Sequence, residues 1–289
     1  MTADQTAIFE AERAALTALC YRMLGERAEA EDAVQETWLR WQGAINSDIS
    51  NPGAWLRRAA TNIAIDTLKS ARIRRETYVG PWLPEPLIQA DGIDFESAFE
   101  QAQECELALL WAMERLDPVE RAIFILREAF DASYDEIAIT VGRSSAACRQ
   151  TVSRAHKKLQ EDSPRFDVPE NEVQALITMF FSAIAMEDFD SARKLFAPDA
   201  IAISDGGRKA RAARRPLIGP DEIIQVWTAV WRKSSQEAGW LLQPAKVNRA
   251  PAIMRLLNGS IDTIITLVPN TQNQIHWLYM MRNPDKLPG

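Results

Sequence analysis

The sequence predicts a multidomain fold in which two all-helical domains precede a C-terminal α+β domain. Apolar residues recur at helical spacing over residues 7–75 and again over residues 95–161. The segment between them lacks this period, and its prolines favour an extended path. After residue 170, helical patterns are followed by short β-like runs, which is typical of an α+β domain. A chain of 289 residues is long enough for two or three such domains.

The first helical domain is predicted to contain three helices. The first ends at Gly25, which can break a helix. A second is expected over residues 28–41, followed by a loop over residues 45–53. Pro52 can open the third helix, because its missing N–H would have no helical partner there. The apolar positions that define these helices are Ile8, Leu16, Leu19, Met23, Val34, Trp38, Trp41, Trp55, Ile63 and Leu68.

Two joints and a mixed C-terminal domain follow. Residues 76–94 are predicted to be a linker, and a second joint is expected at residues 162–169, which contain two prolines. In the C-terminal domain, an amphipathic helix is expected over residues 173–186 and a shorter helix over residues 189–196. The β-like runs are residues 200–204, 252–257, 260–267 and 274–281.

The charges are unevenly distributed along the chain. The net charge of −7 at first argues against a nucleic-acid partner. However, residues 57–75 contain six Lys or Arg and one Asp, and residues 143–158 contain five and no acid. Residues 76–142 contain fifteen acids and three bases. Two basic blocks on an acidic background favour a DNA reader that avoids random DNA, but ordinary solvated helix faces explain them equally well.

Several classes of protein are not expected from the sequence. No run of about eighteen apolar residues is present that could span a membrane. The first twelve residues contain early acids and no apolar run, unlike a signal peptide. The three cysteines stand far apart without a CxxC pair, so neither a disulfide framework nor a metal site is predicted. We expect a cytoplasmic protein with no cofactor and no membrane partner.

Residues 134–159 predict a helix-turn-helix. Gly142 can supply the positive φ of a tight turn, and Ser144 can cap the following helix. An inward stripe recurs there at steps of four, three and four residues: Cys148, Val152, Ala155 and Leu159. The opposite face is polar: Arg149, Gln150, Ser153, Arg154 and Lys157. Arginine and glutamine can make paired hydrogen bonds to base edges in the major groove, although a helical hairpin with a basic exposed face is the alternative.

These residues resemble a known family. Residues 116–159, which include the helix-turn-helix, resemble region 4 of the extracytoplasmic-function (ECF) sigma factors of bacterial RNA polymerase. Residues 29–42, EAEDAVQETWLRWQ, resemble region 2.2 of the same family, and residues 54–75 resemble regions 2.3 and 2.4. The resemblance covers residues 7–161 and has the regions in the order of the family.

Three short motifs extend the resemblance to the rest of the chain. They are VGPWLPEP at residues 79–86, SDGG at residues 204–207 and NPDKL at residues 283–287. They resemble a subfamily whose tail is a SnoaL-like domain of the nuclear-transport-factor-2 (NTF2) type, although Arg208 stands where that subfamily usually has a third glycine. The implied domains are region 2 at 1–75, a linker at 76–94, region 4 at 95–163 and a SnoaL-like regulatory domain at 164–289.

The resemblance implies a sigma factor that binds core RNA polymerase and directs promoter-specific transcription initiation without catalysis of its own. Docking on the clamp helices of the largest polymerase subunit would use Asp32, Gln35 and Glu36. Recognition and melting of the −10 element would use Arg58, Asn62, Asp66, Lys69, Arg72, Arg74 and Arg75. The −35 element would be read by Arg149, Gln150, Ser153, Arg154 and Lys157.

We further expect the C-terminal domain to dock on the linker and to set the distance and orientation of the two DNA-reading domains. Two large apolar side chains of the linker would be costly to leave in water, and the glycines after Asp205 allow close backbone approach. The basic residues within 208–215 are expected to pair with the acidic stretch after the linker. An independent domain on a flexible tether is the alternative. The residues assigned to this regulatory contact are Trp82, Leu83, Pro84, Glu85, Pro86, Asp205, Gly206, Gly207, Asn283, Pro284, Asp285, Lys286 and Leu287.

Two other functions stay open. The C-terminal domain could bind a small-molecule ligand or act as a cyclase or isomerase, but its one histidine, His276, is distant in sequence from Asp205 and Asp262. The chain could also be a two-domain DNA-binding repressor, although a repressor needs neither a polymerase-docking helix nor a melting site. No anti-sigma factor is identifiable from the residues, and the resemblance implies that sigma factors with fused tails often do without one.

Overall fold

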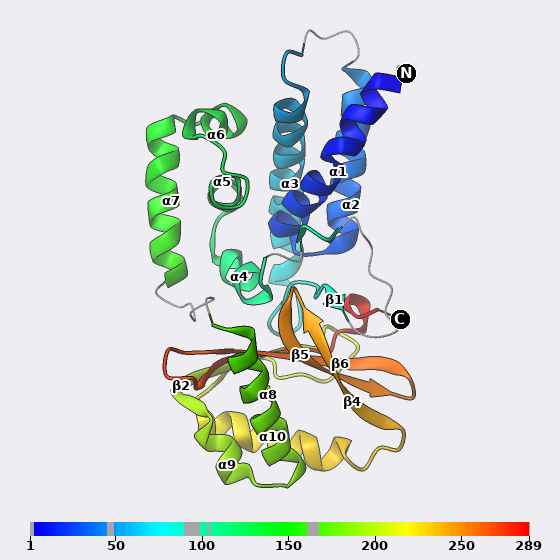
Figure 1. Cartoon of the computed structure of the whole chain (residues 1–289), viewed down its shortest axis with the longest axis vertical. Helices are drawn as coiled ribbons and strands as arrows, with labels where there is room; N and C mark the ends of the chain where they lie inside the picture. Colours follow the sequence, from blue (N-terminus) through cyan, green and yellow to red (C-terminus); the bar gives the residue numbers. More distant parts are fainter. Residues whose placement is uncertain (1–2, 45–48, 90–98, 103–104, 161–167, 289) are drawn as a thin grey trace. The chain divides into compact units, whose positions relative to one another are not determined.

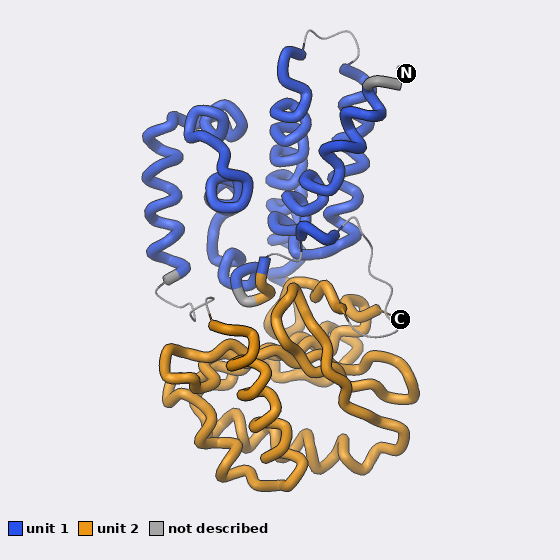
Figure 2. Tube along the Cα trace, viewed as in Figure 1, with its two compact units in different colours: residues 1–76, 95–105, 109–163 blue, residues 77–94, 106–108, 164–289 orange. Residues whose placement is uncertain are grey.

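The chain divides into two compact units, which Figure 2 colours separately. A computed structural model describes residues 3–44, 49–89, 99–102, 105–160 and 168–288. The first unit comprises Met1–Glu76, Phe95–Cys105 and Leu109–Ser163, and the second comprises Thr77–Asp94, Glu106–Ala108 and Pro164–Gly289. Most of the predicted linker therefore belongs to the same unit as the C-terminal domain. Most of the second predicted joint lies outside the described residues.

The first unit is helical throughout the part of it that the structure describes (Figure 1). Its helices are α1 (Ala3–Leu24), α2 (Arg27–Gly43), α3 (Pro52–Glu76), most of α4 (Leu107–Ala112), η3 (Met113–Arg115), α5 (Pro118–Glu128), α6 (Tyr134–Val141) and α7 (Ser145–Gln160). The first three pack against one another and bury Leu16, Leu19 and Leu56 completely. The predicted helix start at Pro52 is confirmed. Burial raises the pKa of Cys20 to about 12, so this thiol is an apolar core group.

Local hydrogen bonds define where the later helices begin and end. Asp117 and Glu120 form a capping box at the start of α5, in which the Asp117 carboxylate accepts the Glu120 N–H at 2.8 Å. Ser133 and Glu136 form a second capping box at the start of α6. Gly142 ends α6 with a φ of 68°, which confirms the predicted turn.

The second unit is built on a sheet that has seven strands in the described residues, in the order β1-β4-β5-β6-β7-β2-β3. Neighbouring strands are antiparallel except β2 and β7, which are parallel. The strands are β1 (Ile88–Gln89), β2 (Phe196–Asp205), β3 (Leu217–Ile218), β4 (Trp240–Val247), β5 (Ala250–Leu257), β6 (Ser260–Pro269) and β7 (Ile275–Met281). The helices are α8 (Glu170–Ala185), α9 (Phe189–Lys194), α10 (Pro220–Ser234) and η4 (Pro284–Lys286).

Aromatic side chains join the helices of this unit to its sheet. α8 packs across β5 and β6, and α10 packs on β2 and α9. The Phe180 ring of α8 lies edge-on to Phe196 of β2 at 5.6 Å and to Trp227 of α10 at 5.0 Å, measured between ring centroids. These rings belong to one apolar core between the helices and the sheet. None of the helices in the described residues is long and apolar enough to cross a membrane.

Several elements of this unit differ from the sequence-based expectation. The structure adds β1 within the linker, β3, β4 and α10. The helix that starts at Phe189 ends at Lys194, and β2 begins at Phe196. β1 has only two residues, which are too few to show the alternation of apolar and polar residues that predicts a strand. β4 contains Pro244, which lacks a ladder N–H and argues against a strand. Among the described residues, β1 pairs with β4 only at Lys246 and Val247, so no described residue of β1 requires a ladder bond from Pro244.

Candidate nucleic-acid interfaces and linker contact

Helix α7 has the two faces predicted for a DNA-reading helix. Cys148, Val152, Ala155 and Leu159 are buried. The polar residues predicted to face outward are all exposed: Arg149, Gln150, Ser153, Arg154 and Lys157. The Ser144 hydroxyl accepts the N–H of Ala147 at 3.2 Å, as expected for a cap. The predicted arrangement of this helix is confirmed, whereas its contact with DNA stays a prediction.

The cationic side chains of α7 are held in different ways. The Arg149 guanidinium carbon lies 4.9 Å from the centroid of the Tyr134 ring. Arg154 donates to the hydroxyl of Thr151 at 3.4 Å, one turn earlier on the same helix. Lys158, which the sequence analysis did not select, forms an ion pair with a carboxylate of α5 at 2.9 Å. Lys158 is therefore engaged with α5 within the protein.

Part of the predicted −10 site lies along one face of α3. Arg58, Asn62 and Asp66 are spaced by four residues, which places them one above another on the helix. Arg58 and Asp66 are exposed, and Asn62 is half-buried. Lys69 forms an ion pair with Asp66 at 3.0 Å. Because both members of this pair are largely exposed, water screens it and leaves both side chains available to a ligand.

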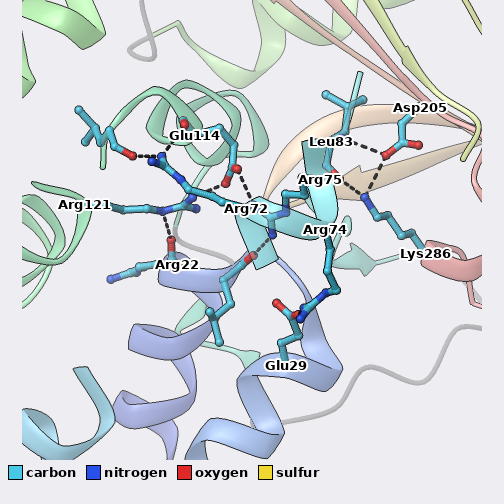
Figure 3. A network of polar contacts seen from close by, with 12 residues as sticks. Arg22, Glu29, Arg72, Arg74, Arg75, Leu83, Glu114, Arg121, Asp205 and Lys286 are labelled. Carbon is cyan, nitrogen blue, oxygen red and sulfur yellow. Dashed lines mark hydrogen bonds and ion pairs between the residues drawn. The ribbon is translucent and has the colours of Figure 1, made fainter. Parts of the chain in front are cut away.

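Two arginines at the end of α3 instead bond to backbone and acidic groups of the first unit (Figure 3). Arg72 donates to the carbonyl oxygen of Glu114 at 2.9 Å and to that of Leu116. Arg75 donates to the carbonyl oxygen of Leu24 at 2.8 Å and to the Glu114 carboxylate. Residues predicted to hold DNA phosphates therefore connect the end of α3 to the segment before α5 in this conformation.

Glu114 is the centre of a buried charge cluster that the sequence analysis did not identify. Arg121 is fully buried, forms an ion pair with the Glu114 carboxylate, and donates its Nε to the carbonyl oxygen of Arg22 at 3.0 Å. Burial by itself raises the pKa of Glu114, but the charges and hydrogen bonds of Arg121 and Arg75 outweigh it and lower that pKa below its usual range. The sequence contains one signal that could have revealed this cluster: Arg121 is a charged residue at an inward position of an amphipathic helix.

The predicted polymerase-docking residues lie on α2. Glu36 pairs with Arg40 of the next turn at 3.0 Å and is half-buried. On the same helix Glu29 pairs with Arg74, the remaining basic residue of the predicted −10 set. Burial and the neighbouring acid Glu26 raise the pKa of Glu29, against the opposing charges of nearby arginines. The other two residues of the predicted docking set, Asp32 and Gln35, are exposed.

Asp205 connects the linker to the C-terminal domain within the second unit (Figure 3). Its carboxylate is fully buried and accepts four hydrogen bonds. The donors are the Tyr78 hydroxyl at 2.6 Å, the Leu83 N–H at 2.9 Å, the Gly207 N–H at 3.0 Å and the Lys286 ammonium at 2.9 Å. Two of these donors come from the linker, one from the SDGG motif and one from the NPDKL motif.

Lys286 completes the contact from the C-terminal motif. Its ammonium is buried, donates to the carbonyl oxygen of Leu83 at 2.6 Å, and lies 4.1 Å from the centroid of the Trp82 ring. Asn283 donates from its side-chain nitrogen to the Tyr78 hydroxyl at 2.8 Å. Three motifs that are far apart in the sequence therefore meet at one place, and a regulatory role for this contact stays a prediction.

The other motif residues vary in burial. Leu83, Pro84, Pro86 and Asn283 are buried, Trp82, Glu85 and Leu287 are half-buried, and Pro284 and Asp285 are exposed. The expectation that Trp82 is fully covered is therefore met only in part.

At Gly206, an added Cβ would lie 2.4 Å from the carbonyl oxygen of Ala210, so this position requires glycine.

The basic run at residues 208–215 has partners other than the expected ones. Lys209 pairs with Asp285 of the NPDKL motif, and Arg215 pairs with Glu222 of α10. Much of the acidic stretch after the linker lies outside the described residues. All four of these charged groups are at least partly exposed, so both ion pairs are worth little to stability.

The linker makes a second contact that sequence reasoning missed. The Asn248 side-chain oxygen accepts the Leu87 N–H at 3.1 Å, and the Asn248 N–H donates to the Leu87 carbonyl oxygen at 2.9 Å. Next to it, β1 pairs with β4 through Ile88 and Val247. Asn248 has a φ of 49°, which asparagine tolerates in turns. The sequence signal that could have indicated this contact is the short Asn-Arg turn between two strands.

The C-terminal domain contains a pocket with an apolar wall and a charged rim. Its lining residues are Phe181, Trp227, Val230, Trp231, Ser234, Leu242, Arg255, Thr263, Ile265, Met280 and Arg282. Asp262 lies beside the rim, where burial raises its pKa but hydrogen bonds from Thr263 and Arg255 and the charge of Arg282 lower it overall. No group of three or more His, Cys, Asp or Glu residues is arranged to hold a metal in the described part of the chain.

Comparison with known proteins identifies a family for the helical part of the chain. A family model described as Sigma-70 region 2 matches residues 8–74, and one described as Sigma-70, region 4 matches residues 106–159. The ECF RNA polymerase sigma factor SigJ of Mycobacterium tuberculosis is 32% identical, with 97% of this chain and 92% of SigJ covered. The probable ECF RNA polymerase sigma factor SigI of the same species is 28% identical, with 91% and 88% covered.

A solved structure extends the likeness to the fold. The crystal structure of M. tuberculosis SigJ matches with a TM-score of 0.77 at 29% identity and covers 97% of each chain. The predicted fold class, two helical sigma domains and an NTF2-like α+β domain, is confirmed. An identity above 30% over almost the full length of a curated relative is sufficient to assign the family. The chain belongs to the extracytoplasmic-function family of RNA polymerase sigma factors.

Proposed function

We propose that this sigma factor docks on core RNA polymerase through α2, reads the −10 element with α3 and the −35 element with α7, and is regulated by its C-terminal domain through the linker. The observation that carries the proposal is the exposed polar face of α7, which stands opposite the buried side chains of Cys148, Val152, Ala155 and Leu159. Such a face can enter the major groove and leave the domain core intact. Core polymerase and promoter DNA, as the partners, place the proposed activity in the cytoplasm.

The readout assignment predicts different effects for two residues of α7. Arg149→Ala should cost roughly 1–3 kcal/mol of promoter binding and relax the preference at one −35 position, because a guanidinium can pair with one base edge. Lys157→Ala should weaken all promoters about equally, because a phosphate contact carries no sequence information. In vitro transcription with core polymerase and a panel of −35 variants measures both. Parent-like transcription by both variants across the panel would show that this face does not read DNA.

The docking assignment predicts a loss of polymerase binding without loss of fold. Asp32→Arg combined with Glu36→Arg should weaken binding to core polymerase, because the reversal inverts the electrostatic match to a basic partner. Asp32 is exposed and Glu36 is only partly buried, so the free energy of unfolding should change little. A pull-down with purified core measures binding, and Glu10→Arg, an exposed acid on α1, is the control. Equal affinities for the parent and the double variant would remove α2 from the docking site.

The assignment of Arg72 and Arg75 to DNA phosphates has a conformational consequence. Both guanidinium groups are engaged with Glu114 and with backbone carbonyls in this conformation. The donors of one guanidinium cannot serve those acceptors and a phosphate at the same time in full. If the two arginines hold promoter phosphates, the contacts between the end of α3 and the segment before α5 must therefore be exchanged for DNA during promoter binding.

The linker contact supports a regulatory role for the C-terminal domain. Leu83 is bonded through both its N–H and its carbonyl oxygen to buried side chains of that domain, so the linker has one fixed path there. A linker with a fixed path restricts the arrangement of the DNA-reading domains more than a free tether of the same length does. The proposal is that this restriction sets the promoter spacing that the protein accepts.

A second candidate function for the C-terminal domain is ligand sensing, favoured by the pocket with its apolar wall and paired arginines. Catalysis in the pocket is less well supported. Asp262 is engaged by two arginines and has a lowered pKa, which makes it a weak general base. His276 lies 3.7 Å from Asp199, and neither lines the pocket.

A dependence of promoter binding on core polymerase would also separate the sigma-factor proposal from a two-domain repressor.

A further inference from the structure

Tyr134 and Arg149 are joined across the helix-turn-helix. Tyr134 is the first residue of α6, and Arg149 lies in the second turn of α7. The guanidinium carbon of Arg149 is 4.9 Å from the centroid of the Tyr134 ring, which is within the range of a cation–π contact. Among the described residues, no carboxylate or hydrogen-bond acceptor engages the Arg149 guanidinium.

The starts of the two helices are fixed relative to each other. Tyr134 follows Ser133, whose capping box with Glu136 sets the first turn of α6. The hydroxyl of Ser145, at the start of α7, donates to the Asp135 carboxylate. The ring of Tyr134 is half-buried, and Arg127 of α5 also lies over it at 5.2 Å. The ring therefore has a second guanidinium neighbour besides Arg149 and is partly buried, which restricts its movement.

Stacking on a ring suits an arginine that reads a base. The guanidinium is planar, and a ring contact uses its face while its N–H donors remain at the edge. Recognition of guanine needs two such edge donors in one plane. An unrestrained arginine side chain must lose its rotational freedom when it binds, and a ring that already holds it reduces that loss. The remaining arginine of the predicted face, Arg154, donates to the Thr151 hydroxyl at 3.4 Å and lies near the carboxylate of Glu120, whose pKa its charge helps to lower.

We infer that Tyr134 is a positioning residue that holds Arg149 for base readout and thereby contributes to −35 specificity. This inference rests on the proposed function of α7. The ring needs no contact with DNA to have this effect, and its hydroxyl is not required. Loss of the ring should therefore lower −35 specificity, whereas loss of the hydroxyl alone should not. The loss of specificity should occur in a protein that is still folded.

The test compares three single variants and one double variant as full-length protein bound to core polymerase. Tyr134→Leu removes the ring face but keeps an apolar side chain, Tyr134→Phe keeps the ring, and Arg149→Ala removes the reader. Binding is measured on a parent promoter and on promoters with each −35 base replaced. Tyr134→Leu should weaken binding to the parent promoter roughly three- to thirtyfold. It should also relax the preference at the position that Arg149→Ala relaxes, whereas Tyr134→Phe should behave like the parent.

The double variant distinguishes positioning from an independent role. If Tyr134 acts through Arg149, Tyr134→Leu with Arg149→Ala should bind no more weakly than Arg149→Ala alone. Losses that multiply, or a loss in Tyr134→Leu that is equal on every −35 variant, would overturn the inference while Arg149 remains a base reader. An Arg149→Ala protein with unchanged preference at every position would overturn both the inference and the proposed readout by α7. Thermal unfolding of each variant checks that the helix-turn-helix is folded.

Discussion

Asp205→Ala is expected to destabilise the second unit by about 3–5 kcal/mol and to release the linker from it. The substitution removes the acceptor of four hydrogen bonds and leaves the buried ammonium of Lys286 without its carboxylate. An uncompensated buried charge costs more than a lost surface pair, because water cannot replace the missing partner. Chemical denaturation measures the stability, and hydrogen exchange at the Leu83 and Leu87 amides measures release of the linker.

A matched control for this prediction lies in the same contact region. Asp285 also pairs with a lysine, Lys209, but both side chains are more than half exposed. Asp285→Ala should therefore change stability by less than about 1 kcal/mol and leave the exchange of the Leu83 amide slow. Asp205→Asn keeps the shape and an acceptor, so it should fall between the two. Slow exchange at Leu83 in Asp205→Ala would mean that the carboxylate does not hold the linker.

Promoter-spacing measurements connect this prediction to regulation. If the fixed linker sets the accepted spacing, Asp205→Ala should transcribe a wider range of spacings between the −10 and −35 elements than the parent does. Asp285→Ala should keep the range of the parent. An unchanged range in a protein whose linker is released would support an independent domain on a flexible tether.

Glu114→Ala is expected to destabilise the first unit by about 3–5 kcal/mol. The substitution leaves Arg121, which is fully buried, and Arg75, which is mostly buried, without their shared carboxylate. Glu10→Ala is the control, because Glu10 pairs with Arg13 on the surface of α1, and its loss should cost less than about 1 kcal/mol. Denaturant unfolding followed by circular dichroism compares them. Equal losses in the two variants would show that the cluster contributes no more than a surface pair.

The same carboxylate predicts a pH dependence. The pKa of Glu114 is lowered in the folded protein, although burial alone would raise it, because Arg121 and Arg75 favour the charged form. Its stabilising contribution is therefore fully present above the unfolded-state pKa of roughly 4.3, and it is lost as the pH falls through the lower folded-state value. The stability difference between the parent and Glu114→Ala should shrink as the pH is lowered below about 4. A difference that is constant from pH 7 to below pH 4 would contradict the assigned charge state.

Much of the fold and part of the candidate site follow from short-range patterns. The start of α3 at Pro52, the turn at Gly142 and the two faces of α7 were predicted because each depends on residues a few positions apart. The strand β4 was missed because Pro244 argues against a strand, and only the tertiary structure shows that the described part of β1 pairs with β4 at other residues.

The sequence by itself determined the class of protein, the order of its domains and the residues of the three motifs that meet at the linker. Only the tertiary structure decided which groups compensate one another. It placed Lys286 beside Asp205 and Glu114 between Arg75 and Arg121, and it gave Tyr134 the Arg149 guanidinium as a neighbour. The physical reason is range. Helical periodicity and capping act within one or two turns, whereas a buried charge is compensated by whichever opposite charge the packed chain brings within a few ångströms.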